Sequence, residues 1–487
     1  MEYIIAHDFG TSSVKSCIFS TDGECVRTVT GKYETYVLHN SWVEQEPEDW
    51  WDVFCENNRV LTQNLPEGKI ICVSFCGTYP NCIPVGEDRR PLCRALIWQD
   101  CRNGEEAEEM ASMLPAEYLN VYRDRKVTVD RTAGKLLWLR RHRPEIYRKI
   151  WKVILSPSNY IVLRLTGEAY TDLRIGFSTG LSNLERNAWS DDVLQALDIP
   201  KCILPEMHKR TDIVGEITEK MAAVCHIPAG AKLVVGTGDG DSADIAVGML
   251  KDGDGCLNGC TSASIQIINS KVKGPWLMPT SCSGAAISWM RHQLAVPEEL
   301  RARETGEDPY DLINEAIAKV PAGSNGVIFL PYMAGERATR LNPDAKGSFT
   351  GVTLDTTRQD MMRAVYEGIG MNLNLILQVA RDGGFEITRM PIVGGMGKSA
   401  VLRQIFSDIL DIELFTFENM DVAGCAGSAV LGGIGAGIYQ NEESAYTKFM
   451  KPKDVTVPDK ENHKKYAEKF DLFDKLYQAQ LELYPEM

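Results

Sequence analysis

Residues 3–20 read YIIAHDFGTSSVKSCIFS and are the most informative segment of the chain. An apolar strand runs into a tight turn with glycine, threonine and serine at 10–12, and a second apolar strand follows. Residues 255–268, GCLNGCTSASIQII, repeat this arrangement with their turn at 259–262. Such turns present backbone N–H groups and hydroxyls to an anion. Two of them predict two related halves that face one phosphate chain, which indicates phosphoryl transfer.

The size and charge of the chain limit the classes of function. A length of 487 residues predicts two or three domains. The composition, with 44% apolar and 24% charged residues, is typical of a soluble globular enzyme. The net charge is −15 and no Lys/Arg-rich tract is present, so we expect no nucleic-acid partner. An anionic nucleotide would therefore be bound by glycine turns, helix N-termini and a metal ion.

The ends and the cysteines of the sequence indicate a cytoplasmic protein. The first residues lack the basic start and small-residue cleavage site of a signal peptide. No apolar run reaches the roughly 18 residues that a membrane helix needs, so we expect no membrane partner. The 14 cysteines are scattered and form no Cys-x-x-Cys pair. Free thiols in a reducing compartment explain them better than a zinc site or a disulfide framework.

The hydrophobic pattern predicts an α/β protein. Apolar runs predict strands at 3–8, 14–20, 70–76, 153–155, 231–235, 327–330 and 389–393. Helical spacing predicts helices that start after Pro47 and that cover about 134–142, 361–379 and 424–437, with a charged helical tail from about 455 to 487. Ser190 is predicted to cap a helix over 191–197.

Two acidic segments follow predicted strands. A carboxylate at Asp8, just before the first turn, can hold hydrated Mg²⁺ while the turn faces phosphate. By itself this segment would also suit an ordinary hairpin, and the second copy of the turn favours the functional interpretation. Residues 236–248, GTGDGDSADIAVG, place acids where a helix begins, near Asp241. An acid there accepts N–H bonds and stays ionised, which suits a plain N-cap or a base that takes a hydroxyl proton.

Two further segments suit nucleotide and sugar binding. Residues 394–399, GGMGKS, are not a P-loop, because Ile392 occupies the position where that motif needs glycine. A flat ring such as adenine could approach this turn, and a plain strand-to-helix turn is the alternative. Residues 42–47 and 98–102 each place tryptophan beside polar groups, which suits a polyhydroxy ligand or a surface loop with a packed tryptophan.

Together these motifs resemble the FGGY family of carbohydrate kinases, with the closest likeness to xylulokinases and related pentulose kinases. The resemblance extends from Asp8 to about Gly437. It implies two ribonuclease-H-like domains of the actin and hexokinase superfamily around a central cleft. It also implies transfer of the ATP γ-phosphate to a sugar hydroxyl with Mg²⁺. The implied domains are residues 1–246 on the sugar side and 247–440 on the nucleotide side, with a helical tail at 441–487.

The resemblance assigns roles to individual residues. Asp8 is implied to anchor the metal ion. The phosphate-binding residues implied are Gly10, Thr11, Ser12, Thr261 and Ser262. The adenosine site implied is Gly394, Gly395, Ser399 and Gln404, with residues 424–429 behind it. The sugar-binding residues implied are Gly77, Thr78, Tyr79, Trp98, Asp100 and Arg102. Residues 335–337 are similar to a loop that follows the family's Leu-Pro-Tyr strand.

The catalytic base has two candidates. In this family a glycine follows the base by seven positions, and counting back from Gly248 gives Asp241. The string Gly-Thr-Gly-Asp instead favours Asp239. We prefer Asp241, because helix register sets the direction of the side chain.

The substrate is the least determined feature of the sequence. Xylulokinases usually carry Gly-Gln-Met-His-Gly where residues 77–81 read GTYPN, and Cys260 stands where glycine is common. We expect a kinase for a ketopentose or similar polyol, with ATP and the sugar as ligands. L-Ribulose, L-xylulose, gluconate, glycerol or a tetritol are alternative substrates, and a catalytically silent sugar or nucleotide sensor is an alternative function. The sequence leaves a homodimer open.

Overall fold

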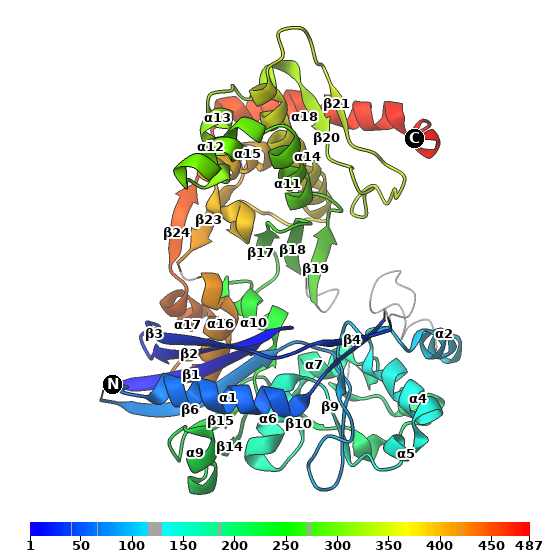
Figure 1. Ribbon diagram of the computed structural model, residues 1–487, viewed down its shortest axis with the longest axis vertical. Coiled ribbons are helices and arrows are strands. Elements are labelled where there is room, and N and C mark those ends of the chain that lie inside the picture. Colours follow the sequence, from blue (N-terminus) through cyan, green and yellow to red (C-terminus); the bar gives the residue numbers. More distant parts are fainter. Residues whose placement is uncertain (40, 66, 115–128, 184–186, 270–273, 419) are drawn as a thin grey trace. The chain divides into compact units, whose positions relative to one another are not determined.

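The protein is described by a computed structural model that covers residues 1–39, 41–65, 67–114, 129–183, 187–269, 274–418 and 420–487 (Figure 1). The chain forms two compact units. Unit 1 consists of Met1–Gly248 and Asp421–Met450, and unit 2 consists of Met249–Met420 and Lys451–Met487. Residues 421–450, which the resemblance assigned to the second domain and the tail, pack in unit 1.

Unit 1 is built on one mixed sheet. Its strand order is β14 (Ile213–Glu216), β15 (Lys232–Val234), β6 (Lys69–Gly77), β1 (Glu2–Phe9), β2 (Ser13–Ser20) and β3 (Cys25–Lys32). The pairs β15–β6 and β6–β1 are parallel, and the outer pairs are antiparallel. A short strand, β16 (Thr237–Gly238), also pairs in parallel with the end of β6.

The sheet of unit 2 repeats this pattern. Its strand order is β24 (Pro452–Thr456), β23 (Glu413–Phe417), β22 (Arg389–Val393), β17 (Gly255–Asn258), β18 (Ser264–Asn269) and β19 (Gly274–Pro279). Here too β23–β22 and β22–β17 are parallel, and the outer pairs are antiparallel. The two predicted turns therefore occupy the same place in two sheets of the same topology, which confirms the predicted α/β fold with two related halves.

The two faces of the unit 1 sheet are covered differently, and β1 shows why. Side chains alternate along a strand, so every second residue of β1 points to the same face. His7 packs edge-on against Phe54 of helix α1 (Pro47–Thr62), with ring centroids 4.7 Å apart. Ile4 and Asp8 point to the other face, which is covered by helix α16 (Ala423–Gly435). The alternation thus brings the Asp8 carboxylate to the N-terminal end of α16.

The remaining elements of unit 1 surround this sheet. The other helices are α2 (Gly104–Met113), α4 (Thr132–His142), α5 (Pro144–Tyr147), α6 (Pro157–Thr166), α7 (Leu173–Ser178), α8 (Asp191–Leu197), α9 (Glu219–Cys225), α10 (Asp239–Ala246) and α17 (Glu442–Phe449). Short strands pair as β4 (Tyr36–Leu38), β5 (Trp42–Gln45) and β8 (Ala95–Leu96); β7 (Ile83–Val85) and β9 (Lys152–Ile154); β10 (Tyr170–Asp172) and β13 (Glu206–His208); β11 (Ser182–Asn183) and β12 (Ala188–Trp189).

Unit 2 has its own apolar core around its longest helix. Helix α14 (Arg358–Asp382) begins with a capping box at Thr357 and buries Ile369, Leu373 and Ile376. The other elements are α11 (Gly284–Gln293), α12 (Val296–Thr305), α13 (Pro309–Ala318), α15 (Ala400–Leu410), α18 (Lys460–Gln480), β20 (Ile328–Leu330) and β21 (Ser348–Thr350). Tyr466 and Phe473 of α18 are buried in this core, so one face of the predicted charged tail is packed.

Several local predictions are confirmed. Ser190 caps α8, since its hydroxyl accepts a hydrogen bond from the backbone N–H of Val193. The glycine-alanine segment forms α16. The predicted helix near Asp241 begins two residues earlier, at Asp239, with Gly238 as its N-cap residue. Within the described residues, no helix combines the length and the apolar character needed to cross a bilayer.

Candidate active site

In unit 1, the candidate residues gather where three parallel strands end. Phe9 at the end of β1 and Gly238 at the end of β16 both pair with Gly77, the last residue of β6. In sheets of this kind, ligands bind at the carboxyl ends of the parallel strands. The residues that flank these ends are Asp8, Thr78, Tyr79, Asp239 and Asp241.

The Asp8 carboxylate lies in a tight polar setting. It accepts a weak hydrogen bond from the Cys76 thiol, 3.5 Å from Oδ1. A Cβ on Gly424 would come within 2.2 Å of Asp8 Oδ2, so only glycine fits at this point of α16. Gly424 packs against Asp8, and its carbonyl accepts a 2.8 Å hydrogen bond from Ser242; the expected place of residues 424–429 behind the adenosine turn stays a prediction.

The electrostatics of Asp8 suit a cation. Burial, reinforced by the charge of the nearby Asp239 carboxylate, raises the pKa of Asp8 to about 6. Burial also raises the pKa of Asp239. Among the described residues, no group of three or more His, Cys, Asp or Glu side chains forms a metal site. Mg²⁺ is typically held by one or two carboxylates together with substrate phosphates and water, so an Asp8–Asp239 pair fits this ion.

The turn at residues 10–12 is fixed through its carbonyl groups. The Tyr33 hydroxyl donates to the Gly10 carbonyl, and Gln45 Nε2 donates to the Thr11 carbonyl at 2.5 Å. The Ser12 side chain is exposed. The side chains of Tyr33 and Gln45 therefore fix the backbone of this turn, while Ser12 faces solvent. This arrangement suits an anion-binding turn.

Asp241 is the most strongly hydrogen-bonded acid of the cluster. The Tyr79 hydroxyl donates to Asp241 Oδ2 at 2.6 Å, and Arg174 Nε donates to Oδ1 at 2.7 Å. The Asp241 side chain is 12% exposed. Asp239 Oδ1 accepts a 2.8 Å bond from the N–H of the adjacent Gly240. The predicted capping by an acid is wrong, since the N-cap residue of α10 is Gly238 and, among the described residues, no side chain caps this helix.

Tyr79 reaches Asp241 because Gly238 has no side chain. A Cβ on Gly238 would lie 1.9 Å from the Tyr79 ring, so the ring packs directly on the glycine backbone. Burial and the Asp241 charge raise the pKa of the Tyr79 hydroxyl, which keeps it protonated and a donor at neutral pH. Gly77 and Thr78 support this segment, and the Thr78 N–H donates to the Phe9 carbonyl at 2.9 Å.

Two acids near Asp241 were not identified from the sequence. Burial, reinforced by the Asp241 charge, raises the pKa of both Asp172 and Asp244 to about 7. Asp172 caps α7 and also accepts a 3.1 Å bond from the Thr237 hydroxyl. Arg174, which also went unnoticed, is brought beside Asp241 by α7. The sequence pattern Asp-x-Arg at the start of this short helix could have drawn attention to Arg174. The pattern does not, however, identify Asp241, 67 positions further along the chain, as its partner.

The predicted sugar-side residues divide into one accessible side chain and a buried ion pair. Trp98 is 40% exposed. Asp100 is fully buried; it accepts a 2.7 Å bond from the Val43 N–H and binds Arg102 through both carboxylate oxygens. Arg102 also donates to Glu44 at 2.7 Å, and its side chain is 3% exposed. Its guanidinium lies over the rings of two further tryptophans, Trp42 and Trp138. Contact of Asp100 and Arg102 with a ligand stays a prediction.

In unit 2, the two glycine turns that were predicted to bind nucleotide lie side by side. The Gly259 N–H donates to the Val393 carbonyl at 2.7 Å, and the Gly259 carbonyl accepts from the Met396 N–H at 3.1 Å. Gly394 has a φ of +84°, and a Cβ there would come within 2.7 Å of the Gly259 carbonyl oxygen. A Cβ on Gly395 would meet nothing within 4 Å, so this glycine borders open space. The Thr261 side chain is exposed beside them.

Ser399 precedes α15 and Gln404 lies on it, and both side chains are hydrogen-bonded to other residues of unit 2. Ser399 caps this helix, and its hydroxyl donates to Asn314 Oδ1 at 2.8 Å. Gln404 Nε2 donates to Asp408 at 2.7 Å and to the Val457 carbonyl at 3.0 Å. Their contact with adenosine stays a prediction, since these hydrogen bonds account for both side chains.

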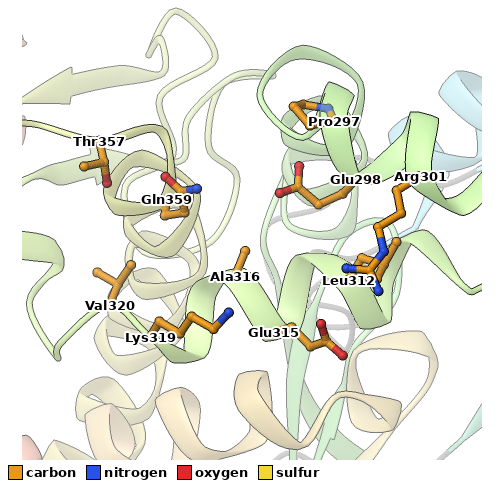
Figure 2. A pocket seen from close by; sticks show the side chains of 10 residues that line it. All are labelled: Pro297, Glu298, Arg301, Leu312, Glu315, Ala316, Lys319, Val320, Thr357 and Gln359. Carbon is orange, nitrogen blue, oxygen red and sulfur yellow. The ribbon is translucent and has the colours of Figure 1, made fainter.

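One cavity of unit 2 lies apart from these turns. It has a volume of about 440 Å³ and is bordered by α12, α13 and the start of α14 (Figure 2). Its lining includes Glu298, Arg301, Glu315 and Lys319. Glu298 is already paired with Arg358 at 2.6 Å. None of the predicted site residues lines this cavity.

Comparison with known proteins agrees with this architecture. Residues 3–246 match the N-terminal domain of the FGGY family of carbohydrate kinases, and residues 231–436 match its C-terminal domain. A gluconokinase of Bacillus subtilis (strain 168) is 30% identical over 451 residues, which cover 88% of this chain and 87% of the relative. A xylulose kinase of Escherichia coli (strain K12) is 28% identical over 488 residues, which cover 98% and 99%.

Solved structures show the same similarity over the whole length. A gluconate kinase from Lactobacillus acidophilus has a TM-score of 0.82 at 26% identity, with 100% of this chain and 99% of that chain covered. A xylulose kinase from the same organism has a TM-score of 0.81 at 26% identity, with full coverage of both chains. The chain therefore belongs to the FGGY family of carbohydrate kinases.

Proposed function

We propose that this carbohydrate kinase transfers the γ-phosphate of ATP to a hydroxyl group of a ketopentose related to xylulose, with Asp241 as the base. One observation carries the proposal. The Asp241 carboxylate, at the carboxyl ends of three parallel strands, is held by Tyr79 on one oxygen and by Arg174 on the other. An acid with this orientation and partial exposure is suited to take a proton from a bound hydroxyl.

The proposed chemistry uses the remaining lone pairs of Asp241. A carboxylate can accept about four hydrogen bonds, so a sugar hydroxyl can join the two existing donors. As the hydroxyl oxygen forms its bond to the γ-phosphorus, its proton passes to Asp241, and the bond from the γ-phosphorus to the β–γ bridging oxygen breaks to release ADP. Tyr79 and Arg174 keep the carboxylate in one orientation during this step.

The acidic pair of Asp8 and Asp239 is the proposed magnesium site. Bound Mg²⁺ would neutralise the charge of the transferring phosphate. The raised pKa values of both acids support this assignment. They show that burial and a neighbouring carboxylate disfavour the negative charge of each acid, and a bound cation would offset this cost. We propose that Gly10, Thr11 and Ser12 contact phosphate from unit 1.

The proposed nucleotide contacts of unit 2 are Thr261, Ser262, Gly394 and Gly395, with Ser399 and Gln404 on the helix that follows. The hydrogen-bonded contact between the 259–262 and 394–397 segments supports a shared ligand. The open space beside Gly395 suits the close approach of a flat ring.

The substrate has two supported candidates. The xylulose kinases of Escherichia coli and Lactobacillus acidophilus, which align over nearly all of this chain, favour a xylulose-like ketopentose. Arg174 favours a second candidate, a sugar acid such as gluconate, because a guanidinium next to the base can pair with a carboxylate. The 30% identical gluconokinase of Bacillus subtilis supports this alternative.

A coupled ADP-release assay with a panel of ketopentoses, polyols and aldonates tests the function, with and without Mg²⁺. We expect sugar-dependent turnover that requires Mg²⁺. Asp241→Asn should abolish it, whereas Asp239→Asn should weaken Mg²⁺ binding, so that measurable turnover requires a higher Mg²⁺ concentration. Full activity of Asp241→Asn would reassign the base. No response to any sugar, with ATP binding intact, would instead favour a sensor.

The cytoplasmic location and a homodimer remain proposals from the sequence. Cell fractionation tests the first. Size-exclusion chromatography with light scattering tests the second.

A further inference from the structure

Arg337 lies on the proposed phosphate turn of unit 2. Its Nη2 donates to the Ser262 hydroxyl at 3.1 Å, and its Nε donates to the Thr280 carbonyl at 3.3 Å. Thr280 is itself fixed next to the turn, since its N–H donates to the Ala263 carbonyl at 2.8 Å. Arg337 is exposed, so the guanidinium covers the turn and still faces solvent.

The charge of Arg337 has no acidic partner among the residues that the structure describes. Three other arginines of unit 2 form ion pairs: Arg340 with Asp474 at 2.6 Å, Arg358 with Glu298 at 2.6 Å and Arg363 with Glu367 at 2.7 Å. Within the described ranges, the side-chain hydrogen bonds of Arg337 go to a hydroxyl and a carbonyl, which are neutral acceptors. In a chain of net charge −15, a cation without a carboxylate partner beside a Thr-Ser turn is available for an anionic ligand.

The loop that carries Arg337 is held rigidly by the preceding residue. The buried Glu336 carboxylate accepts from the N–H groups of Arg337 and Ala338 at 2.7 and 2.9 Å, and from Asn372 Nδ2 at 2.6 Å. Gly335 has a φ of +67°, and a Cβ there would come within 2.6 Å of the Pro343 carbonyl oxygen. The arginine backbone is therefore fixed in advance, which reduces the entropy that ligand binding costs.

We propose that Arg337 binds the triphosphate of the nucleotide at the 259–262 turn, through its planar fork of N–H donors. The inference rests on the proposed function and names a further residue for the same site. A guanidinium can donate two parallel hydrogen bonds to phosphate oxygens, which a lysine ammonium cannot reproduce. The Ser262 hydroxyl, now an acceptor for Arg337, keeps the fork aligned over the turn.

The test is nucleotide binding measured by isothermal titration calorimetry on the full chain without sugar. ATP, ADP, AMP and adenosine are compared for wild type, Arg337→Ala, Arg337→Lys and the control Arg303→Ala. Arg303 is an exposed arginine of α12 in the same unit. Arg337→Ala should weaken ATP binding by about tenfold to hundredfold, as expected for the loss of hydrogen bonds to a charged group. Adenosine binding should change less than about twofold, and Arg337→Lys should fall between the two for ATP.

Each outcome decides the inference. Equal ATP affinity of Arg337→Ala and wild type would overturn it and leave the proposed kinase function intact. An equal loss of affinity for adenosine and for ATP in Arg337→Ala would also overturn the inference, because such a loss would show that Arg337 only maintains the structure of the loop. Wild-type protein that binds no ATP would overturn the proposed function, and this inference with it. The inference is supported if Arg337→Ala loses affinity for ATP and ADP but not for adenosine, and if Arg303→Ala binds all of them as wild type does.

Discussion

The hydroxyl of Tyr79 donates a 2.6 Å hydrogen bond to Oδ2 of Asp241, although 162 residues separate them in the chain. Tyr79 belongs to the segment in which this sequence departs from the usual xylulokinase pattern. The residue that replaces the family's methionine therefore contacts the proposed base directly.

Tyr79→Phe removes the hydroxyl and keeps the ring. We expect kcat to fall about tenfold or more, because a hydrogen bond to a charged group contributes about 1.5–3 kcal/mol and here fixes the orientation of the base. The KM for ATP should not change. Steady-state kinetics with the best sugar of the panel measure both. Tyr36→Phe, a tyrosine of β4, is the matched control, and an unchanged kcat in Tyr79→Phe would contradict the role of Tyr79.

Gly238→Ala should displace the Tyr79 ring. The new Cβ would lie 1.9 Å from a ring carbon, so the ring or the start of α10 has to move. We expect the kcat loss of Tyr79→Phe or a larger one, with a loss of about 1–3 kcal/mol in the free energy of unfolding from overpacking. Urea denaturation and kinetics measure the two effects.

Gly240→Ala provides the comparison for Gly238→Ala, since a Cβ at Gly240 meets nothing within 4 Å. Alanine within a helix is favoured over glycine by up to about 1 kcal/mol, so stability should stay the same or rise. Equal destabilisation by both substitutions would show that the Tyr79 contact is not the cause.

Asp244→Asn should stabilise the protein in a pH-dependent way. Burial and the Asp241 charge raise the pKa of Asp244 from an ordinary 3.8 to about 7. Below the ordinary value the acid is protonated in both states, so ionisation costs nothing. As the pH rises from about 4 to about 7, the unfolded chain ionises first, and the acid increasingly destabilises the folded state. Above pH 7 this destabilisation is constant.

The expected gain in the free energy of unfolding for Asp244→Asn is therefore greatest at pH 8, smaller at pH 5 and absent below about pH 4. Its size at pH 8 should be on the order of 4 kcal/mol, because each pKa unit between 3.8 and about 7 corresponds to about 1.4 kcal/mol. Urea denaturation at each pH measures it, and Asp355→Asn in an exposed loop serves as the control. A gain that is the same at pH 5 and pH 8 would argue against a raised pKa.

Arg102→Ala tests whether the Trp98–Arg102 segment is structural. The substitution leaves the buried Asp100 carboxylate and Glu44 without their cation. Removal of one partner of a buried ion pair typically costs about 3–5 kcal/mol. We expect a loss of this size in the free energy of unfolding by urea. A protein of normal stability with a raised KM for the sugar would instead favour the direct ligand contact that the sequence predicted.

The helices and strands, and their repetition in two halves, could be predicted from the order of residue types along the chain. The strands at 3–8 and 14–20, the helix after Pro47 and the Ser190 cap depend on hydrophobic periodicity and capping chemistry, which act between neighbours in the chain. The two glycine turns also follow from local composition. These features could be predicted because each depends on a few consecutive residues.

The tertiary structure alone decided which groups meet. Residues 421–450 join unit 1 because Gly424 lets α16 approach Asp8, across more than 400 positions of sequence. Arg174 meets Asp241, and Arg337 meets Ser262, only through the packing of α7 and of the loop after β20. The ion pair between Asp100 and Arg102 is likewise visible only in the folded protein, and their contact with a sugar stays a prediction. Such pairings depend on burial and long-range contacts, which the spacing of residue types along a chain does not encode.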